Sequence, residues 1–573
     1  MTHHWGAVIR QDRSWSVSTW APSAERVAVE LLGQSHAMVR TDAGWWQADV
    51  QAPAGTAYQL KVDGATTPDP ASRLQAGGVN DASVLLDHGA YRWRTNWQGR
   101  PWAEAVIYEM HVGTFTPAGT FAAATEKLAE LADLGFTAIE VMPVGQWSGE
   151  HGWGYDGVLP YAPHPSYGAP EDFKAFIEHA QSLGMMVLLD IVMNHFGPEG
   201  AHLHALAPEF FAPERHTPWG AAIHFDLPEV REFWIGCASM WLVDYRLDGL
   251  RFDAVHEITG PGSDGFLEEM AVRLRALAPE RPIHLITEDD RNIPDWREAG
   301  LYEASWNDDF HHAIHTALTG ENQDYYASYA VNPIDDLCQA LEHGQIEEGQ
   351  PREGRDALRG APSGHLQPTA FINAIQTHDQ IGNRAHGERL ITLADPGAVE
   401  VAYGLLLVAP YIPMIVMGEE RGEQTPFLFF ADFEGELAHA IRQGRADELA
   451  SVADAEGEPP DPLAADTFEA SKLTWKTDEA ARRWLATTRQ GLAFRHRFVM
   501  PLLKSGRIGT AQVRRSGAAS IEAHWRFGAG TLTLAVNLGA VGDRPPAMQA
   551  PQFTLNAIER DKFALSVKAE LDD

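Results

Sequence analysis

Hydrophobic and polar residues alternate along the first part of the chain. The alternation is clearest in residues 15–19, 27–31, 46–50 and 58–62, and turn residues separate these runs. Alternation with a period of two is typical of strands that are buried on one face. The pattern therefore predicts an N-terminal β-sandwich over residues 1–95.

From about residue 103 the strands become continuously apolar and alternate with helical patterns. Residues 121–134 and 170–183 carry apolar side chains at helical spacing, between apolar runs at 105–112, 138–142 and 185–191. Continuous apolar strands separated by helices indicate a parallel sheet that is covered on both faces. Eight such strands fit a (β/α)8 TIM barrel over residues 96–490. The predicted strands begin near residues 105, 138, 185, 249, 283, 304, 370 and 414.

The end of the chain returns to alternation. After a predicted helix near residues 479–494, residues 521–527 and 532–538 alternate, with a glycine-rich turn at 528–530 between them. Two alternating runs joined by a short turn predict a hairpin. The fold class expected for the whole chain is therefore multidomain α/β, with an antiparallel β domain over residues 491–573 at the C-terminal end.

Two stretches interrupt the barrel repeat. Residues 196–228 form a long connection that is rich in histidine and aromatic residues, and long connections inside a compact domain are usually functional. Residues 442–470 are strongly acidic and predict an exposed insertion with a solvated face. The apolar stretch 401–418 contains Pro410 and Pro413, so we interpret it as a buried helix and strand rather than a membrane span.

Composition narrows the classes of partner. The chain has 44 Lys and Arg against 79 Asp and Glu, a formal net charge of −35, which argues against nucleic acid and membrane partners and favours a neutral substrate. Its 18 Trp and 13 Tyr include candidate sugar platforms, among them Trp147 and Trp153. Cys237 and Cys338 allow at most one disulfide, and no apolar leader follows the first residue. We therefore expect a cytoplasmic protein.

Acidic residues follow several of the predicted barrel strands. Asp190, Asp253, Glu288 and Asp379 stand at four such positions, with His195, His256 or His378 close to three of them in sequence. Strand ends of a TIM barrel point into the active site, and a pair of carboxyl groups facing one bond is the standard machinery of glycoside cleavage. Arg251, two residues before Asp253 on the same strand face, is expected to keep Asp253 ionised.

These segments resemble the four motif regions of the α-amylase family of glycoside hydrolases. Asp190, Asn194 and His195 match the first region; Arg251, Asp253 and His256 the second; Glu288 the third; and His378 with Asp379 the fourth. The resemblance implies that Asp253 is the nucleophile, that Glu288 is the acid/base and that Asp379 grips sugar hydroxyls. It also implies that His195 and His378 hold the sugar of the −1 subsite and that Asp190 contributes to substrate binding. Tyr155 follows the second strand, which places it to stack under the same sugar.

Two physical expectations follow for a retaining enzyme. The Asp253 and Glu288 carboxyl groups should lie about 5–5.5 Å apart, leaving no room for a water molecule between them. Burial and the neighbouring charge should raise the pKa of Glu288, while Asp253 stays ionised.

Further segments resemble the trehalohydrolase branch of that family, which acts on maltooligosyltrehalose and releases trehalose. They are residues 216–220, 287–292, 378–384 and 387–390. One departure is Thr377, where that branch typically has Asn. The first 95 residues resemble the carbohydrate-binding-like module that precedes several enzymes of the family. The resemblance further implies maltooligosaccharides as related substrates and a trehalose-forming synthase that works in the same pathway.

Two alternatives remain open at this point: an α-1,4-glucan branching enzyme, and a sugar-binding barrel without activity. Discrimination of a trehalose leaving group must come from residues beyond the acids, and the nearest candidates are Trp219, His256, Asp289 and Arg291. We expect no cofactor and no required metal, because no dedicated carboxylate cage accompanies Asn194.

Overall fold

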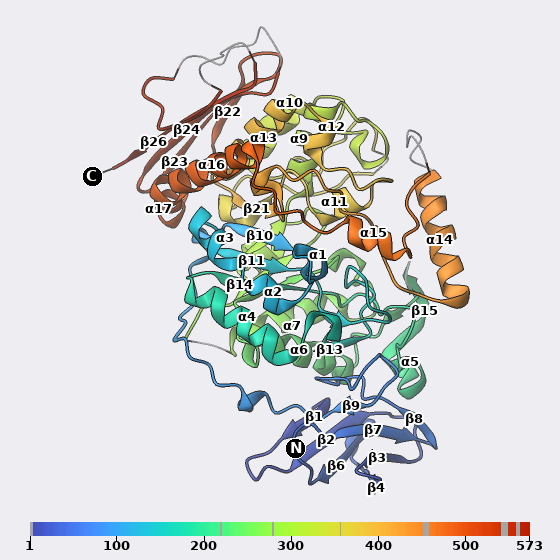
Figure 1. Cartoon of the computed structure of the whole chain (residues 1–573). Helices are drawn as coiled ribbons and strands as arrows, with labels where there is room; N and C mark the ends of the chain where they lie inside the picture. The colour runs from blue at the N-terminus through green and yellow to red at the C-terminus, as the bar shows by residue number, and fades with distance from the viewer. Residues whose placement is uncertain are drawn as a thin grey trace.

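A closed barrel of eight parallel strands forms the centre of the computed structural model (Figure 1). The first strand pairs with the last, so the sheet has no free edge. All eight strands predicted from the sequence are confirmed: β10 (Ile107–Met110), β11 (Ala138–Val141), β14 (Met186–Ile191), β17 (Gly249–Phe252), β18 (His284–Thr287), β19 (Ala304–Trp306), β20 (Phe371–Asn373) and β21 (Ile412–Val416). The structure describes residues 4–217, 220–277, 280–355, 357–450, 458–539, 548–556 and 562–572.

The barrel interior changes from apolar to polar along the strands. Ile107, Met186, Leu188, Ile286 and Met414 belong to one buried apolar cluster. Buried charged side chains stand near the carboxyl ends of barrel strands: Glu109, Glu140, Asp190 and Arg251. The apolar residues therefore fill one half of the barrel, and the polar half faces the carboxyl ends of the strands, where a TIM barrel carries its site.

The covering helices follow the sequence prediction with one correction. The helix predicted over residues 121–134 is two short helices, α2 (Phe121–Thr125) and α3 (Leu128–Leu134), because the chain turns at residues 126–127. The next helix, α4 (Pro170–Ser182), begins at a proline as predicted. The apolar stretch 401–418 is also as predicted, a buried helix, α13 (Pro396–Val408), followed by β21.

Two antiparallel sheets precede the barrel. The first contains β1 (Gly6–Ile9), β2 (Trp15–Trp20), β6 (Trp45–Val50) and β5 (Val39–Arg40). The second contains β4 (Gln34–Ala37), β3 (Val27–Leu31), β7 (Ala57–Val62) and β8 (Ala65–Thr67), with β9 (Ser83–Val84) beside β7. The four predicted strands correspond to β2, β3, β6 and β7.

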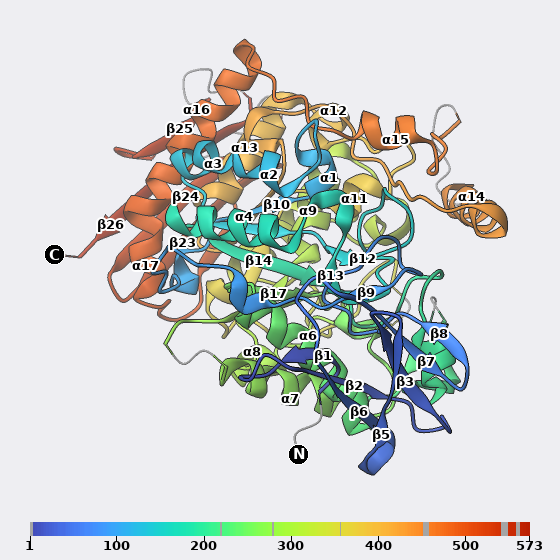
Figure 2. The ribbon, with the colours of Figure 1, turned by 60° about the horizontal axis from the view of Figure 1, so that its bottom comes forward.

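The N-terminal sheets contact a barrel helix, α6 (Pro228–Val243). The indole nitrogen of Trp5 donates to the Glu229 carbonyl at 2.9 Å, and the Trp5 ring meets the Phe233 ring edge to face at 5.1 Å. Figure 2 brings these strands forward over the α6 side of the barrel. A tryptophan buried at 2% exposure therefore anchors the first sheet to the barrel.

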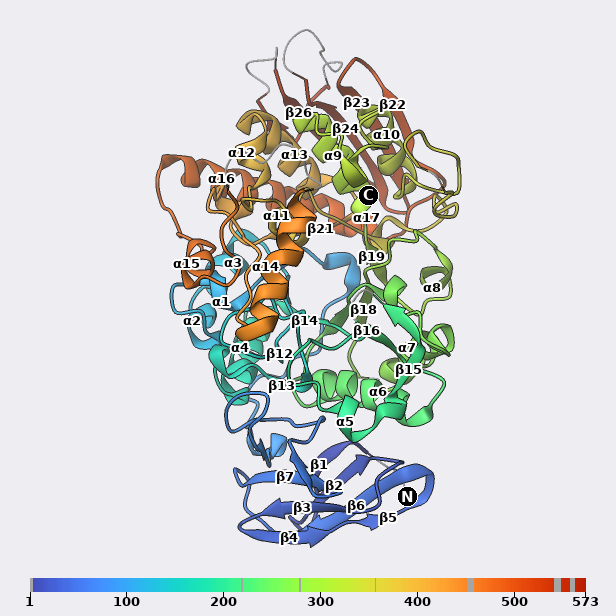
Figure 3. The ribbon, with the colours of Figure 1, turned by 90° about the vertical axis from the view of Figure 1, so that its right-hand side faces the viewer.

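A five-stranded antiparallel sheet follows the barrel, at the end of the molecule opposite the N-terminal strands (Figures 1 and 3). Its order is β22 (Gln512–Arg515), β23 (Ser520–Phe527), β24 (Gly530–Asn537), β26 (Ala564–Leu571) and β25 (Phe553–Leu555). The predicted hairpin is β23–β24, and the predicted helix before it is α16 (Glu479–Phe494). The domain boundaries at residues 95 and 490 stay predictions.

The two interruptions of the barrel repeat have structure of their own. Residues 196–228 contain α5 (Leu203–Leu206) and a hairpin of β15 (Phe211–Thr217) and β16 (Gly220–Ile223). The acidic region contributes α14 (Gly435–Ala450) and α15 (Ala465–Ala470), while residues 451–457 lie outside the described part of the chain. Figure 3 shows α14 and the β15–β16 hairpin on opposite sides of one end of the barrel.

Two further findings concern general properties. Within the described residues, no helix combines the length and the apolar character that crossing a membrane requires. Cys237 and Cys338 are both free thiols, so the disulfide that two cysteines would allow is not formed.

Candidate active site

Acidic side chains stand at the carboxyl ends of neighbouring barrel strands. Asp190 belongs to β14, and Asp253 and Glu288 directly follow β17 and β18. Asp379 lies in the short helix α11 (His378–Gly382), after β20. Because β14, β17 and β18 are adjacent in the barrel, the first three carboxyl groups converge.

Arg251 joins three of these acids. Its Nη1 donates to Asp190 Oδ2 at 2.6 Å and to Asp253 Oδ1 at 2.7 Å, and its Nη2 lies 2.7 Å from Glu288 Oε2. The side chain is 1% exposed, and the guanidinium carbon lies 4.0 Å from the centre of the Trp306 ring. The contact with Asp253 is the one that the spacing on the strand predicts. The contact with Glu288 was not predicted.

Sharing one guanidinium changes the expected protonation. Burial raises the pKa of Asp253 well above its usual value; Arg251 opposes that shift, and the charges of Glu288 and Asp190 add to it. Burial also acts on Glu288, but Arg251 and the backbone N–H of Ala254, which donates to Glu288 Oε2 at 2.9 Å, lower the pKa of Glu288. Both shifts run opposite to the expectation. Arg251 serves both acids rather than Asp253 alone, Glu288 has the Ala254 N–H in addition, and Asp253 faces the charges of both Glu288 and Asp190.

His378 is held by a residue that the sequence did not single out. Its Nδ1 lies 2.6 Å from Glu109 Oε1, and its backbone N–H donates to Glu109 Oε2 at 3.1 Å. Although burial favours the neutral ring, the Glu109 carboxylate raises the pKa of His378 to about 9. The imidazole is therefore a cation at neutral pH. The ring of Tyr155 stacks on it at 5.3 Å, and the Tyr155 hydroxyl donates to Asp190 Oδ2 at 2.7 Å.

His195 contacts the backbone of Tyr155. Its Nε2 lies 3.0 Å from the Tyr155 carbonyl, and its Nδ1 contacts Asn194 Oδ1. Burial lowers the pKa of His195 to about 4, so this ring is neutral where His378 is charged. Asn194 in turn donates to Asp253 Oδ2 at 3.4 Å. The structure thus brings His195, His378 and Tyr155 together with Asp190 and Asp253, while the roles that the resemblance implies for them stay predictions.

Asp379 is oriented by the helix that carries it. Asn383 donates to Asp379 Oδ1 at 2.9 Å. Thr377 is the N-cap of α11: its hydroxyl oxygen accepts from the Asp379 N–H at 3.2 Å, and Gln380 completes a capping box. The residue that departs from the family pattern therefore caps the helix that presents Asp379.

Of the residues predicted to recognise the leaving group, His256, Asp289 and Arg291 lie in the described part of the chain, close to the segment after Glu288. The N–H of Asp290 donates to His256 Nδ1 at 3.3 Å, which ties the segment after Glu288 to the segment after Asp253. Asp289 and Arg291 form a two-point ion pair at 2.8 and 3.0 Å. Trp219 lies outside the described residues, so its predicted place in the site stays a prediction.

One group in the described part of the chain has ligand atoms close enough for a metal. His256, Asp289 and Asp290 offer atoms that lie within 4.8 Å of one another. Arg291 already neutralises Asp289 through two hydrogen bonds, so the donor set does not fit a divalent cation well. We assign no metal site to it.

Sequence reasoning missed two more acids beside the site. Asp308 follows β19 and is half-buried; burial and the charge of Glu288 raise its pKa to about 7. Glu140 lies inside the barrel at 1% exposure, and burial raises its pKa to about 8. The signal was present in both cases, since an acid within or just after an apolar barrel strand is the pattern that identified Asp190 and Glu288.

Two proposed sugar platforms are core residues instead. Trp147 is 2% exposed and stacks on His164 at 3.8 Å. Trp153 is 7% exposed, and its indole nitrogen donates to the Leu428 carbonyl at 3.0 Å. Neither ring has an exposed face large enough to stack on a sugar.

A closed eight-stranded barrel with paired acids at its strand ends is the architecture of a glycoside hydrolase. The family model of the α-amylase catalytic domain matches residues 88–208. The crystal structure of an α-amylase-like protein from Salmonella typhimurium superposes with a TM-score of 0.95, at 45% identity over 99% of this chain and 100% of that one.

Curated relatives narrow the class. The malto-oligosyltrehalose trehalohydrolase of Deinococcus radiodurans is 40% identical over 464 residues, covering 80% of this chain and 77% of that protein. The 1,4-α-glucan branching enzyme of Cellvibrio japonicus is 31% identical over 275 residues, covering 42% and 37%. The chain belongs to the malto-oligosyltrehalose trehalohydrolase family.

Proposed function

We propose that this glycoside hydrolase cleaves the α-1,4-glucosidic bond next to the trehalose end of maltooligosyltrehalose, releasing trehalose and a maltooligosaccharide with retention of configuration. The observation that carries the proposal is the convergence of Asp253 and Glu288 on one buried guanidinium, in a chain of the trehalohydrolase family. Two carboxyl groups held side by side suit a double displacement, because a nucleophile must reach the sugar carbon directly.

In the first step, Asp253 attacks the anomeric carbon while Glu288 protonates the leaving oxygen. The bond between sugar and leaving group breaks, trehalose leaves with the proton, and a covalent glycosyl ester forms on Asp253. Asn194, which donates to Asp253 Oδ2, orients the attacking carboxylate, together with Arg251 on Oδ1. In the second step, Glu288 removes a proton from water, and the resulting hydroxyl displaces the sugar from Asp253.

The proton must change place when substrate binds. In the free enzyme, Arg251 favours the anion of Glu288, and Asp253 has the raised pKa. Positive charge that develops on the sugar beside Asp253 favours the Asp253 carboxylate, and the leaving oxygen offers Glu288 a new partner. Asp253 and Glu288 therefore share one proton, and this proton is on Glu288 when cleavage of the glucosidic bond begins.

The other side chains act on the −1 sugar. His378 is a charged donor, His195 a neutral ring and Asp379 a helix-mounted carboxylate. Groups of this kind fix sugar hydroxyls in the transition state. The fourth group, Tyr155, lies against His378 and is tied to Asp190, so it forms the floor beneath the same subsite.

Product analysis tests the proposal directly. The purified chain is incubated with maltotriosyltrehalose, and the sugars are separated by chromatography; trehalose and maltotriose should appear in equal amounts. A branching enzyme would instead change the iodine colour of amylose without producing trehalose. Failure to release trehalose while amylose becomes branched would overturn the proposal in favour of that alternative.

We also propose a cytoplasmic location and a pathway partner. Two free cysteines suit a reducing compartment, and a net charge of −35 suits a neutral glucan. The substrate carries a trehalose unit at the end of a glucan, so a synthase that rearranges the terminal linkage must supply it. Detection of the protein in a cytosolic fraction tests the location.

A further inference from the structure

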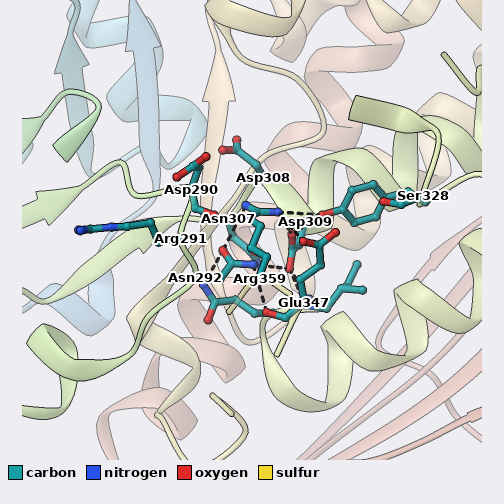
Figure 4. Close-up of polar contacts among 12 residues, drawn as sticks. Asp290, Arg291, Asn292, Asn307, Asp308, Asp309, Ser328, Glu347 and Arg359 are labelled. Atoms are coloured by element: carbon teal, nitrogen blue, oxygen red, sulfur yellow. Dashed lines mark hydrogen bonds and ion pairs between the residues drawn. The ribbon is translucent and has the colours of Figure 1, made fainter. Parts of the chain in front are cut away.

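The segment that follows the acid Glu288 is tied down by a network outside the catalytic acids (Figure 4). The acid protonates the leaving oxygen, so the chain that continues from it borders the leaving-group side. Residues 289–292 form this segment, and it also reaches His256 through the Asp290 N–H. The contacts that hold residues 289–292 in place therefore affect how the trehalose unit is bound.

Asp309 is the centre of the network. Its side chain is fully buried, and five donors reach its two oxygens. Oδ2 accepts from Asn292 Nδ2 at 2.8 Å and from the backbone N–H groups of Ile346 and Glu347 at 2.7 and 2.8 Å. Oδ1 accepts from Tyr329 at 2.5 Å and from Arg359 at 3.2 Å.

Arg359 ties the same segment from a second direction. Its Nε contacts the Asp290 carbonyl, and its Nη1 reaches Asp309 Oδ1 and Glu347 Oε2 at 3.2 Å each. The guanidinium thus bridges Asp309 to the chain two residues after Glu288. The Asn292 carbonyl accepts from the Ala361 N–H at 3.2 Å, which adds a backbone contact from the same loop.

The link through Asn292 is the one that fixes the backbone. Asn292 has a φ of 55°, in the left-handed region, which Asn tolerates better than most residues. Its Oδ1 accepts from Gln345 Nε2 at 3.0 Å, and its Nδ2 donates to Asp309, so both ends of the amide are used. Both oxygens of the Asp309 carboxylate accept hydrogen bonds from donors. Replacing Asp309 by Asn would therefore turn one oxygen into an NH2 group that faces other N–H groups.

We propose that Asp309 is a positioning residue for the leaving-group side of the cleft. Acting through Asn292 and Arg359, it holds residues 289–292 in the conformation that receives the trehalose unit. The inference rests on the proposed function, and it predicts selectivity: loss of the anchor harms substrates that need the leaving-group side and spares those that do not.

Two substrates separate these cases. Maltotriosyltrehalose requires a disaccharide leaving group to be bound and protonated. α-Maltotriosyl fluoride presents the same glucan to the other side of the cleft, but its leaving group is a single small anion that needs little protonation. The ratio of the two kcat/KM values reports on the leaving-group side alone, and a general loss of folding lowers both together.

The central variant is Asn292→Gly. Glycine keeps the left-handed backbone and removes the side-chain amide, and with it the hydrogen bonds of Asn292 to Asp309 and Gln345. Asn556→Gly is the matched control, because Asn556 has a φ of 52° and follows β25, in the C-terminal sheet. Asp309→Asn is the second variant, which disturbs the anchor itself.

For Asn292→Gly, we expect kcat/KM for maltotriosyltrehalose to fall about tenfold, through a higher KM, with less than about a twofold change for the fluoride. Asp309→Asn should shift the ratio in the same direction, and Asn556→Gly should leave both values unchanged. Equal losses on both substrates, or no loss in a folded Asn292→Gly protein, would overturn the inference. A wild-type protein that releases no trehalose would instead refute the proposed function.

Discussion

Glu109 forms two hydrogen bonds with His378, although 269 positions separate the two residues in the chain. One carboxylate oxygen meets the ring Nδ1 at 2.6 Å and the other accepts the backbone N–H at 3.1 Å. Both side chains are nearly fully buried, at 2% and 4% exposure. The pair fixes the ring orientation and keeps it charged. The ring Nε2–H, which is not hydrogen-bonded to any described residue, can therefore serve as a donor beside the acids.

The ion pair predicts a pH-dependent stability that Glu109→Gln removes. The pKa of His378 is raised from its usual 6.5 to about 9 in the folded protein. A raised pKa contributes stability that is complete below about pH 6.5 and is lost as the pH rises through about 9. The wild type should therefore lose of the order of 3 kcal/mol relative to the variant across this window.

Thermal midpoints of both proteins between pH 6 and pH 10 measure this difference. The gap between the two midpoints should be largest near pH 6 and should close by about pH 10. His343, whose pKa is also raised, titrates in both proteins and cancels. Parallel curves over the whole range would mean that Glu109 does not hold the charge on His378.

The roles of the two acids predict a split between substrates. Glu288→Gln should lower the hydrolysis of maltotriosyltrehalose by about 10²–10⁴-fold, the typical contribution of a general acid. The same variant should still form the glycosyl ester from α-maltotriosyl fluoride, because fluoride leaves without protonation. Asp253→Asn should abolish reaction with both substrates. Near-normal hydrolysis of the trehalosyl substrate by Glu288→Gln would contradict the assignment.

Much of the fold could be predicted from the sequence, because the barrel strands are continuous apolar runs. The prediction failed where short-range chemistry outweighs periodicity. The turn at residues 126–127 divides one predicted helix into two, and the long connection after the third strand contains the β15–β16 hairpin. Neither feature changes the hydrophobic pattern enough to be visible in it.

The candidate site was predicted as a set of residues but not as a set of contacts. Asp190, Asp253 and Glu288 stand at strand ends, which sequence pattern can locate. The Arg251 guanidinium contacts all three acids, and this depends on the directions of side chains in neighbouring strands, which the sequence does not show. For this reason the prediction of which acid, Asp253 or Glu288, has the raised pKa was wrong. Glu109 was overlooked because its partner comes from the far end of the barrel sequence.

Retention of configuration can be tested by the first product. Proton NMR recorded within the first minutes of reaction should show the α-anomer of the new reducing end, before mutarotation produces the β-anomer. This outcome corresponds to a separation of about 5–5.5 Å between the Asp253 and Glu288 carboxyl groups. Initial formation of the β-anomer would mean that a water molecule attacks directly and that the carboxyl groups act about 6.5–9.5 Å apart.

Thr377 provides the last prediction, because it caps the helix that carries Asp379. Its hydroxyl oxygen accepts from the Asp379 N–H, and its own backbone N–H donates to Gln380 at 2.9 Å. Thr377→Ala should cost about 1 kcal/mol of stability, the usual value of an N-cap, and should lower kcat more than it raises KM because Asp379 loses its orientation. Thr377→Asn restores a good capping side chain and should keep kcat within about twofold of the wild type. Thermal midpoints and steady-state kinetics of the two variants measure both effects. If Thr377→Asn were as impaired as Thr377→Ala, the hydroxyl itself rather than the cap would be required.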